Sequence, residues 1–181
     1  MPEPVIIVPY DPIWPTLFIE LGLALRETLG RTVLRIDHIG STSIPGLAAK
    51  PIIDTQISVS SFEPLDAYRG PIVSPGYVFR ATNSDLTKRY FREKPGTRRT
   101  HIHMRRAGSW AEQFALLFRD YMRSHPEDVQ HYAELKYHLA QTYRVDRHSY
   151  TDVKAPFIWE IMAKADRWVQ ATGWEPVLSD V

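Results

Sequence analysis

The chain has 181 residues, of which 44% are hydrophobic and 24% charged, and its formal net charge is +1. A chain of this size forms one globular domain with a sizeable core, and the balanced charge excludes a general attraction to nucleic acid or to anionic membranes. Cysteine is absent, which excludes disulfides and thiolate ligands, and no apolar run approaches the ~20 residues that span a bilayer. We therefore expect a single cytoplasmic domain over residues 1–181.

Residues 1–107 are predicted to be rich in strands. Leucines at every fourth position predict an amphipathic helix over residues 14–29 that ends at Gly30. Runs rich in valine and isoleucine predict the first two strands, and a short helix over residues 64–68 precedes the break at Gly70-Pro71. The predicted strands cover residues 33–39, 52–59, 77–80, 88–92 and 99–106, with the last two forming a hairpin.

Residues 108–172 are predicted to be helical. Ser109 with Glu112, and Ser124 with Glu127, have the spacing of capping boxes and predict the starts of two helices. A third helix begins around Pro156, and residues 173–181 are expected to form a loose tail. The fold class is therefore α/β (α+β), with a mixed sheet first and a helical C-terminal half.

A turn rich in small and hydroxyl residues follows the first predicted strand, in Gly40-Ser41-Thr42-Ser43. Glycine lets a backbone approach a ligand closely, so the turn can offer N–H groups and hydroxyls to a phosphate. The alternative is a simple turn in which Thr42 or Ser43 caps a short helix at Pro45.

Asp54 and Gln56 lie two apart on the second strand, so their side chains share one face. A carboxylate there can hold the Mg²⁺ or Mn²⁺ that accompanies a bound phosphate, while Gln56 offers an amide oxygen without charge. Alternatively, Asp54 pairs locally with Lys50 or an arginine. Asp37 is a candidate second acid, although it precedes the turn.

His101 and His103 also share a strand face, together with Arg99 and Arg105. Histidines in this position can ligate a metal, act as a general base or contact phosphate, and arginine suits bidentate phosphate contact. The alternatives are a buried histidine pair and a solvated basic strand edge. Lys154 can reach the same cleft or lie on the surface as an ordinary lysine at a helix start.

Four polar residues in the helical half are interpreted as structural contacts: Arg119, Asp120, His125 and Lys136.

Separated blocks in one order resemble a known family over residues 8 to 165. They include Val8-Pro9-Tyr10-Asp11-Pro12-Ile13-Trp14-Pro15, His38-Ile39-Gly40-Ser41-Thr42-Ser43-Ile44-Pro45-Gly46, His101-Ile102-His103, Phe118-Arg119-Asp120-Tyr121-Met122-Arg123-Ser124-His125-Pro126 and Tyr150-Thr151-Asp152-Val153-Lys154-Ala155-Pro156-Phe157-Ile158. The pattern resembles the GrpB family of nucleotidyltransferase-like proteins. The resemblance implies a nucleotidyltransferase-like sheet, in which Gly-Ser is followed by Asp-x-Asp or Asp-x-Glu; here Gln56 stands at the second carboxylate position.

The resemblance also implies a function: transfer of a nucleoside monophosphate from a triphosphate to an acceptor hydroxyl, amine or phosphate. It implies Mg²⁺ or Mn²⁺ as cofactor and a nucleotide or other phosphorylated small molecule as partner, with no nucleic acid and no membrane. The implied site has catalytic Asp54, His101 and His103, metal ligands Asp54 and Gln56, and phosphate contacts from Gly40, Ser41, Thr42, Ser43, Lys50, Arg99, Arg105 and Lys154.

Two alternatives to this enzyme remain. One is a non-catalytic module for a nucleotide or phosphorylated ligand that has lost the metal carboxylate pair; family members fused to a dephospho-coenzyme A kinase connect this alternative to coenzyme A metabolism. The other is a metal hydrolase built on the His-x-His pair of His101 and His103.

Overall fold

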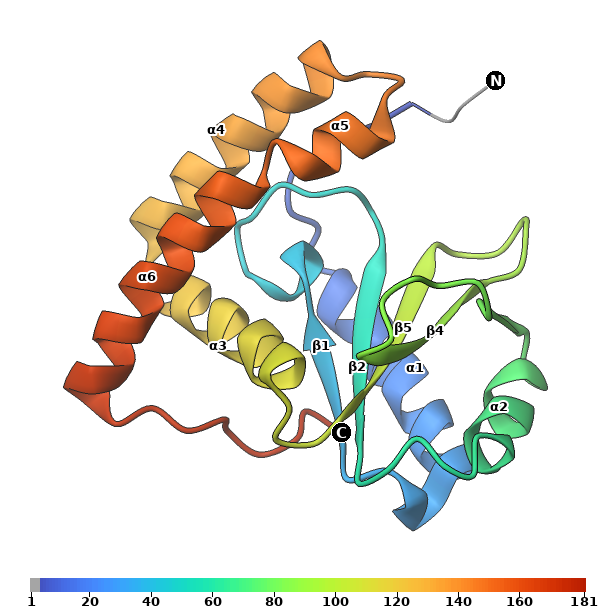
Figure 1. Ribbon diagram of the computed structural model, residues 1–181. Coiled ribbons are helices and arrows are strands. Elements are labelled where there is room, and N and C mark those ends of the chain that lie inside the picture. The colour runs from blue at the N-terminus through green and yellow to red at the C-terminus, as the bar shows by residue number, and fades with distance from the viewer. Residues whose placement is uncertain (1–3) are drawn as a thin grey trace.

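A five-stranded mixed sheet forms the centre of the computed structural model, which describes residues 4–181 (Figure 1). The strand order is β1-β2-β5-β4-β3, and β2 and β5 are parallel whereas the other neighbours are antiparallel. The strands are β1 (Arg35–Ile39), β2 (Ile53–Val59), β3 (Tyr77–Phe79), β4 (Lys88–Glu93) and β5 (Thr100–Arg106). Each begins and ends within two residues of its predicted bounds, and the predicted hairpin is the β4–β5 pair.

The two faces of the sheet differ in polarity because side chains alternate along each strand. Ile36, Ile57, Phe91 and Ile102 lie on the apolar face, fully buried in one core cluster. Helices α1 (Trp14–Leu29) and α2 (Asp66–Val73) cover this face. The short helix predicted over residues 64–68 starts later and runs longer, since Tyr68 and Ile72 are both buried in or against this core.

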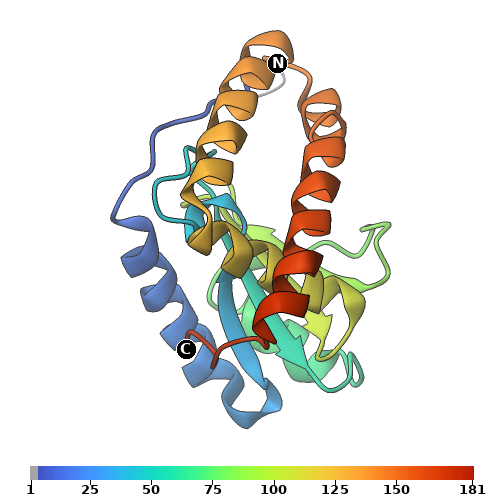
Figure 2. The same cartoon turned by 90° about the vertical axis from the view of Figure 1, so that its left-hand side faces the viewer.

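The polar face of the sheet meets the helical half of the chain. Helix α3 (Trp110–Ser124) lies across it, and α4 (Pro126–Thr142), α5 (Arg147–Asp152) and α6 (Ala155–Thr172) continue beyond (Figures 1 and 2). Tyr132 of α4 stacks on Phe157 of α6 with ring centroids 4.9 Å apart. Tyr132 belongs to a second core cluster, which also includes Ile44 and Leu47. The helical half therefore packs against the loop that follows the short 3-10 helix η2 (Ser41–Ser43).

The helix starts were predicted with mixed success. Ser109 caps α3 as expected, accepting a hydrogen bond from the Glu112 N–H at 3.4 Å. The second capping box is wrong: the Ser124 hydroxyl donates to the carbonyl of Asp120, and α4 begins at Pro126 after the N-cap His125 without a side-chain cap. The 3-10 turn η1 (Gly30–Thr32) and helix α5 had not been predicted.

The expectation of a loose C-terminal tail is also wrong. The tail returns from α6 to β1 (Figure 1), where the Ile36 N–H donates to the Ser179 hydroxyl at 2.8 Å and the His38 N–H donates to the Asp180 carboxylate at 2.8 Å. The reason lies in the strand order. β1 is an edge strand, and its outward backbone groups require partners.

Arg119 joins this tail to the interior. Its side chain is fully buried and lies 2.7 Å from Asp120, 3.0 Å from Asp180 and 3.5 Å from Asp37. Because the carboxylates around it neutralise this buried guanidinium, Arg119 and Asp120 make structural contacts, as predicted from the sequence.

None of the helices in residues 4–181 combines the length and apolarity that crossing a membrane requires.

Candidate functional site

A cavity of about 370 Å³ lies between the polar face of the sheet and the helical half. Its walls come from the Gly40 turn, β2, β5 and helices α3 to α6, so both halves of the chain contribute. The lining residues are Ile39, Gly40, Ser41, Thr42, Lys50, Ile52, Asp54, His101, His103, Phe114, Ala115, Phe118, Tyr132, Lys136, Tyr150, Thr151, Lys154 and Ile158.

The Gly40 turn packs directly on the carboxylate of Asp54. Gly40 has a φ of +69°, which favours glycine, and a Cβ placed there would lie 2.7 Å from Asp54 Oδ2. Any side chain at position 40 would therefore push the carboxylate away from its position. Glycine is required here both by the backbone conformation and by the neighbour.

Asp54 faces both histidines of β5. The parallel pairing aligns Asp54 with His101 and Gln56 with His103. Asp54 Oδ1 lies 3.1 Å from His101 Nδ1 and 3.4 Å from His103 Nε2. Tyr90 of β4 packs against both imidazoles, with ring centroids 5.7 and 5.1 Å away. The predicted meeting of Asp54 with the histidine pair is thus present in the fold.

The histidines keep Asp54 ionised. Burial alone would raise the pKa of the Asp54 carboxyl, but hydrogen bonds with His101 and His103 outweigh burial and lower this pKa well below its usual range. Burial lowers the pKa of His103, and Asp54 only partly opposes that shift. Asp54 is therefore an ionised carboxylate, and the His103 imidazole next to it favours its neutral form.

Gln56 does not reach the cavity. Its side chain is fully buried on β2 beneath the start of α3, and its amide nitrogen donates to the carbonyl of Glu112 at 3.3 Å. Asp37 is also fully buried, and its carboxylate lies 2.9 Å from Arg35 and 3.5 Å from Arg119. Neither residue stands with Asp54, so Asp54 is the only carboxylate among the described residues that line the cavity.

This donor set fits Mg²⁺ poorly. The fold type implies a divalent ion held by paired carboxylates, because Mg²⁺ prefers oxygen ligands. Asp54, His101 and His103 instead offer one carboxylate oxygen and two imidazole nitrogens, whose ligand atoms all lie within 4.8 Å of one another. The cluster therefore lacks the oxygen ligands that Mg²⁺ requires.

The hydroxyl residues of the turn have different tasks. Thr42 is buried, donates to the carbonyl of Ile52 at 3.0 Å and lies 3.0 Å from His38 Nε2. Burial lowers the pKa of His38 to about 3, so its imidazole is neutral. Because the Thr42 hydroxyl already donates its one proton to Ile52, His38 Nε2–H is the donor to Thr42. Ser43 closes the turn by donating to the carbonyl of Gly40 at 2.6 Å.

Ser41 lines the cavity as Thr42 does, but unlike Thr42 and Ser43 it is only half-buried. Thr42 and Ser43 thus make the internal contacts of the turn alternative, whereas Ser41 lies at the cavity surface.

Three lysines approach the cavity from different elements. Lys50 precedes β2, and Lys154 lies at the start of α6; their ammonium nitrogens lie 5.0 and 4.6 Å from the ring centre of Tyr150. Lys136 of α4 is only 2% exposed, and its nitrogen lies 4.5 Å from the ring centre of Tyr132. Such contacts with aromatic faces partly compensate a cation for lost water.

Burial and mutual repulsion make these lysines costly to charge. Burial lowers the pKa of Lys154 to about 8, with a smaller contribution from Lys50. Burial and then repulsion from Lys154 and Lys50 lower the pKa of Lys136 well below its ordinary value. An anion in the cavity would remove this cost.

The two arginines predicted for the site lie outside the cavity. Arg99 pairs with Glu93 at 2.8 Å. Arg105 donates to the hydroxyl of Thr87 at 3.2 Å, in the loop before β4. Arg99 directly precedes β5 and Arg105 lies near its end, so the two side chains flank the histidine pair and contact Glu93 and Thr87 instead of the cavity.

Lys136 also lines the cavity, although the sequence predicts only a structural contact for it. Its position carries a usable signal: Val129, Tyr132, Lys136 and Leu139 follow helical spacing, and all four are buried. A lysine within an apolar helical stripe is unusual. Tyr150 gave no comparable signal, because its role depends on α5, which had not been predicted.

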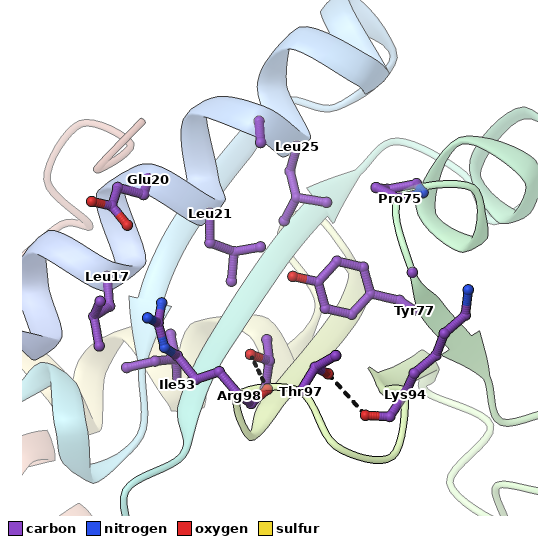
Figure 3. A pocket seen from close by; sticks show the side chains of 13 residues that line it. Leu17, Glu20, Leu21, Leu25, Ile53, Pro75, Tyr77, Lys94, Thr97 and Arg98 are labelled. Carbon is purple, nitrogen blue, oxygen red and sulfur yellow. Dashed lines mark hydrogen bonds between the residues drawn. The ribbon is translucent and has the colours of Figure 1, made fainter.

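A second hollow lies on the other side of the sheet, between α1 and β3 (Figure 3). It is larger, about 610 Å³, and Leu17, Leu21 and Leu25 of α1 together with Tyr77 form much of its wall. The residues predicted for the site do not line this hollow, and its carboxylate Glu20 is not part of a metal-capable cluster among residues 4–181. The candidate chemistry is concentrated in the cavity on the polar face.

Comparisons with known proteins agree with this architecture. A profile described as GrpB protein matches residues 4–164. The chain is 39% identical over 163 residues to the UPF0157 protein YqkA of Bacillus subtilis, covering 90% of this chain and 47% of that protein. It is 32% identical over 199 aligned positions to a dephospho-CoA kinase of Mycolicibacterium paratuberculosis, covering 96% of this chain and 49% of the kinase. The chain thus spans about half the length of these relatives.

Solved structures give the same result. The crystal structure of the conserved protein GrpB from Enterococcus faecalis matches with a TM-score of 0.82 at 34% identity, covering 90% of this chain and 99% of that chain. Cid1 in complex with its short product ApU matches with a TM-score of 0.50 at 14% identity, covering 75% and 43%. The likeness to Cid1 shows the fold alone, which is nucleotidyltransferase-like. The chain belongs to the GrpB family.

Proposed function

We propose that the cavity binds a nucleotide or a related phosphorylated small molecule. The observation that carries this proposal is the convergence of Lys50, Lys136 and Lys154 on a cavity whose described lining includes one carboxylate. A polyphosphate would neutralise the lysines, and Ser41 would donate a hydroxyl hydrogen bond to it. The volume of about 370 Å³ lies within the range of small-molecule sites.

The ligand's apolar part has a separate wall. Phe114, Phe118 and Ile158 line the cavity from α3 and α6. An aromatic face suits a nucleobase, so the proposed ligand places its phosphates toward the lysines and its base toward α3 and α6.

The reaction we propose is transfer of a nucleoside monophosphate from a triphosphate to an acceptor hydroxyl, amine or phosphate. The acceptor atom forms a bond to the α-phosphorus, and the bond from that phosphorus to the β-phosphate oxygen breaks and releases pyrophosphate. His101 or His103 would take the acceptor's proton. Asp54 would orient the imidazoles through the contacts that it already makes with them.

A binding module without catalysis is the second candidate. The position of Gln56, buried and bonded to the Glu112 carbonyl, favours it, because only Asp54 is left to represent the carboxylate pair of a nucleotidyltransferase. The dephospho-CoA kinase relatives make coenzyme A, with its several phosphates, a ligand to test.

Thermal unfolding with each ligand tests the binding proposal. Nucleoside triphosphates, pyrophosphate and coenzyme A are added to the protein in EDTA and again with Mn²⁺. A ligand present at about 100 times its Kd stabilises the fold by about 2.7 kcal/mol, or roughly 5–10 °C for a chain of this size. Lys154→Met should reduce the shift, whereas Lys94→Met, at an exposed lysine outside the cavity, should not.

The same samples separate the two candidates. Release of pyrophosphate from a triphosphate supports transfer, and binding without release supports the module. The absence of any shift with all of these ligands would refute the binding proposal itself.

A further inference from the structure

The cluster Asp54–His101–His103 is arranged like a metal site with one carboxylate and two imidazoles. The ligand atoms face one another across adjacent parallel strands and lie within 4.8 Å of one another. A divalent ion among three such atoms, at about 2.0–2.2 Å from each, requires only small side-chain movements.

We propose that this cluster is a mononuclear site for a first-row transition ion of the Zn²⁺ or Co²⁺ type, and that it discriminates against Mg²⁺. Imidazole nitrogen is a good ligand for zinc, cobalt, nickel and iron, whereas Mg²⁺ requires oxygen. The proposal makes His101 and His103 metal ligands at the same cavity in place of the proton-accepting role proposed above, and it does not depend on a nucleotide binding there.

The surroundings hold each ligand in place. Asp54 rests against Gly40, which leaves no space for the carboxylate to turn in that direction. The Tyr90 ring packs against both imidazoles. All three ligands lie on strands, Asp54 on β2 and the evenly spaced His101 and His103 on β5. A site on rigid elements needs little reorganisation to bind.

The protons of the two imidazoles decide how an ion can bind. Within residues 4–181, His101 Nε2 and His103 Nδ1 are buried and have no hydrogen-bond partner. Without an ion, the nitrogens that face Asp54, His101 Nδ1 and His103 Nε2, carry the protons of the hydrogen bonds to its carboxylate. An ion that takes their lone pairs displaces these protons, so metal binding should strengthen as the pH rises.

The cavity leaves room for further ligands on the ion. Asp54, His101 and His103 all line it, and three protein ligands leave at least one coordination position open in a tetrahedral ion. The lysines across the cavity would favour an anion at that open position, so the ion and a phosphate oxygen would occupy the cavity together.

Cobalt alone is the probe for the first experiment. Metal-free wild-type protein is titrated with Co²⁺ while visible absorption is recorded, and bound metal is counted after gel filtration. We expect one ion per chain, with an absorption band typical of cobalt bound by imidazole. Zn²⁺ should displace it at equal concentration, and Mg²⁺ in large excess should not.

Variants locate the ion. His101→Ala and His103→Ala should each lower the affinity for Co²⁺ by about a hundredfold or more, since each removes a ligand and even the loss of an outer-shell partner costs about 10- to 100-fold. His131→Ala, at an exposed position of α4, should bind as the wild type does. Circular dichroism checks the fold of each variant, and the more conservative His103→Gln replaces any variant that does not fold.

The wild-type titration decides the matter by itself if all variants unfold. An absence of stoichiometric cobalt, equal competition by Mg²⁺, or full binding by both folded histidine variants would overturn the proposal. If phosphate ligands shift the unfolding temperature in EDTA but cobalt does not bind, the metal site is refuted and the lysine-based binding proposal stands. If cobalt binds but no ligand gives a shift, the metal site stands and the binding proposal is refuted.

Discussion

At the scale of single residues, position 40 sets the geometry of the site. Gly40→Ala must accommodate both a φ of +69° and a Cβ 2.7 Å from Asp54 Oδ2. This backbone conformation, with ψ at −173°, is essentially restricted to glycine and costs another residue about 1–3 kcal/mol, and the collision adds to this. We expect Gly40→Ala to lower the free energy of unfolding in urea by more than that amount and to weaken Co²⁺ binding.

Gly46→Ala is the matched control for this prediction. Gly46 has a φ of +80°, but a Cβ there meets nothing within 4 Å. It should show the backbone cost alone and bind Co²⁺ normally. Equal stability and equal metal binding in the two variants would contradict the role assigned to the Gly40–Asp54 contact.

Lys154 should make anion binding depend on pH. Burial lowers its pKa to about 8, so the free protein loses this charge as the pH rises through that value. Affinity for pyrophosphate should therefore fall above pH 8, by at most about tenfold per pH unit for this one group. Isothermal titration from pH 7 to 9.5 measures the slope.

Lys154→Arg keeps the positive charge over this whole range and is the control, because arginine stays protonated. Its affinity should fall less steeply than that of the wild type. Parallel slopes in the two proteins would assign the pH dependence to the ligand or to the other two lysines.

At the scale of elements, α4 shows a conflict between stability and function. Lys136 lies on its buried face, and its ammonium nitrogen has no hydrogen-bond partner within residues 4–181. Lys136→Met should raise the free energy of unfolding by about 1–3 kcal/mol, since it removes an unsatisfied buried group. The same variant should bind pyrophosphate more weakly than the wild type, as such trade-offs predict.

Urea unfolding and calorimetry measure these two effects. Lys94→Met, in which an exposed lysine is replaced, should leave both quantities unchanged. A less stable Lys136→Met protein would mean that the contact with the Tyr132 ring outweighs the burial of the charge.

Side chains alternate between the two faces along a strand, so the sequence predicts which residues of one strand share a face. The spacing of two between His101 and His103 predicts that both share one face of their strand, and the pairing of β5 with β2 puts that face beside Asp54. The fate of Gln56 could not be predicted in the same way. It shares the strand face with Asp54, but the start of α3 covers it, and where a helix crosses a sheet depends on packing between distant segments.

Local sequence patterns also predicted the helices of residues 108–172 only in part. Ser109 lies just before α3 and caps it, whereas Ser124, with the same spacing to Glu127, is the last residue of α3 and bonds back to Asp120. Lysines and arginines were the hardest to place, because a long flexible side chain on a correctly predicted element can end at different partners. Lys136 turns inward while Arg105 turns to the loop before β4.

At the scale of the whole molecule, the tail holds the sheet and the helices together. Asp180 contacts the buried Arg119 and the backbone of β1. Asp180→Ala should lower the free energy of unfolding by about 1.5–3 kcal/mol, the value of a hydrogen bond to a charged group. Asp152→Ala, at an exposed residue whose ion pair is with His148, should change it little, as exposed pairs do.

Urea unfolding followed by circular dichroism measures both variants. An unchanged midpoint for Asp180→Ala would show that the tail is held by its backbone contacts rather than by this carboxylate.

The position of the tail on β1 has a consequence for solubility. An uncovered edge strand is a template on which a second molecule can add its own strand. Here one edge of the sheet is β3, which has only three residues, and the other is covered by Ser179, Asp180 and Val181, which satisfy the outward groups of Ile36 and His38. Residues 179–181 thus block edge-to-edge self-association at β1. The Asp180 carboxylate accepts the hydrogen bond from His38 that the carbonyl of a neighbouring strand would otherwise accept.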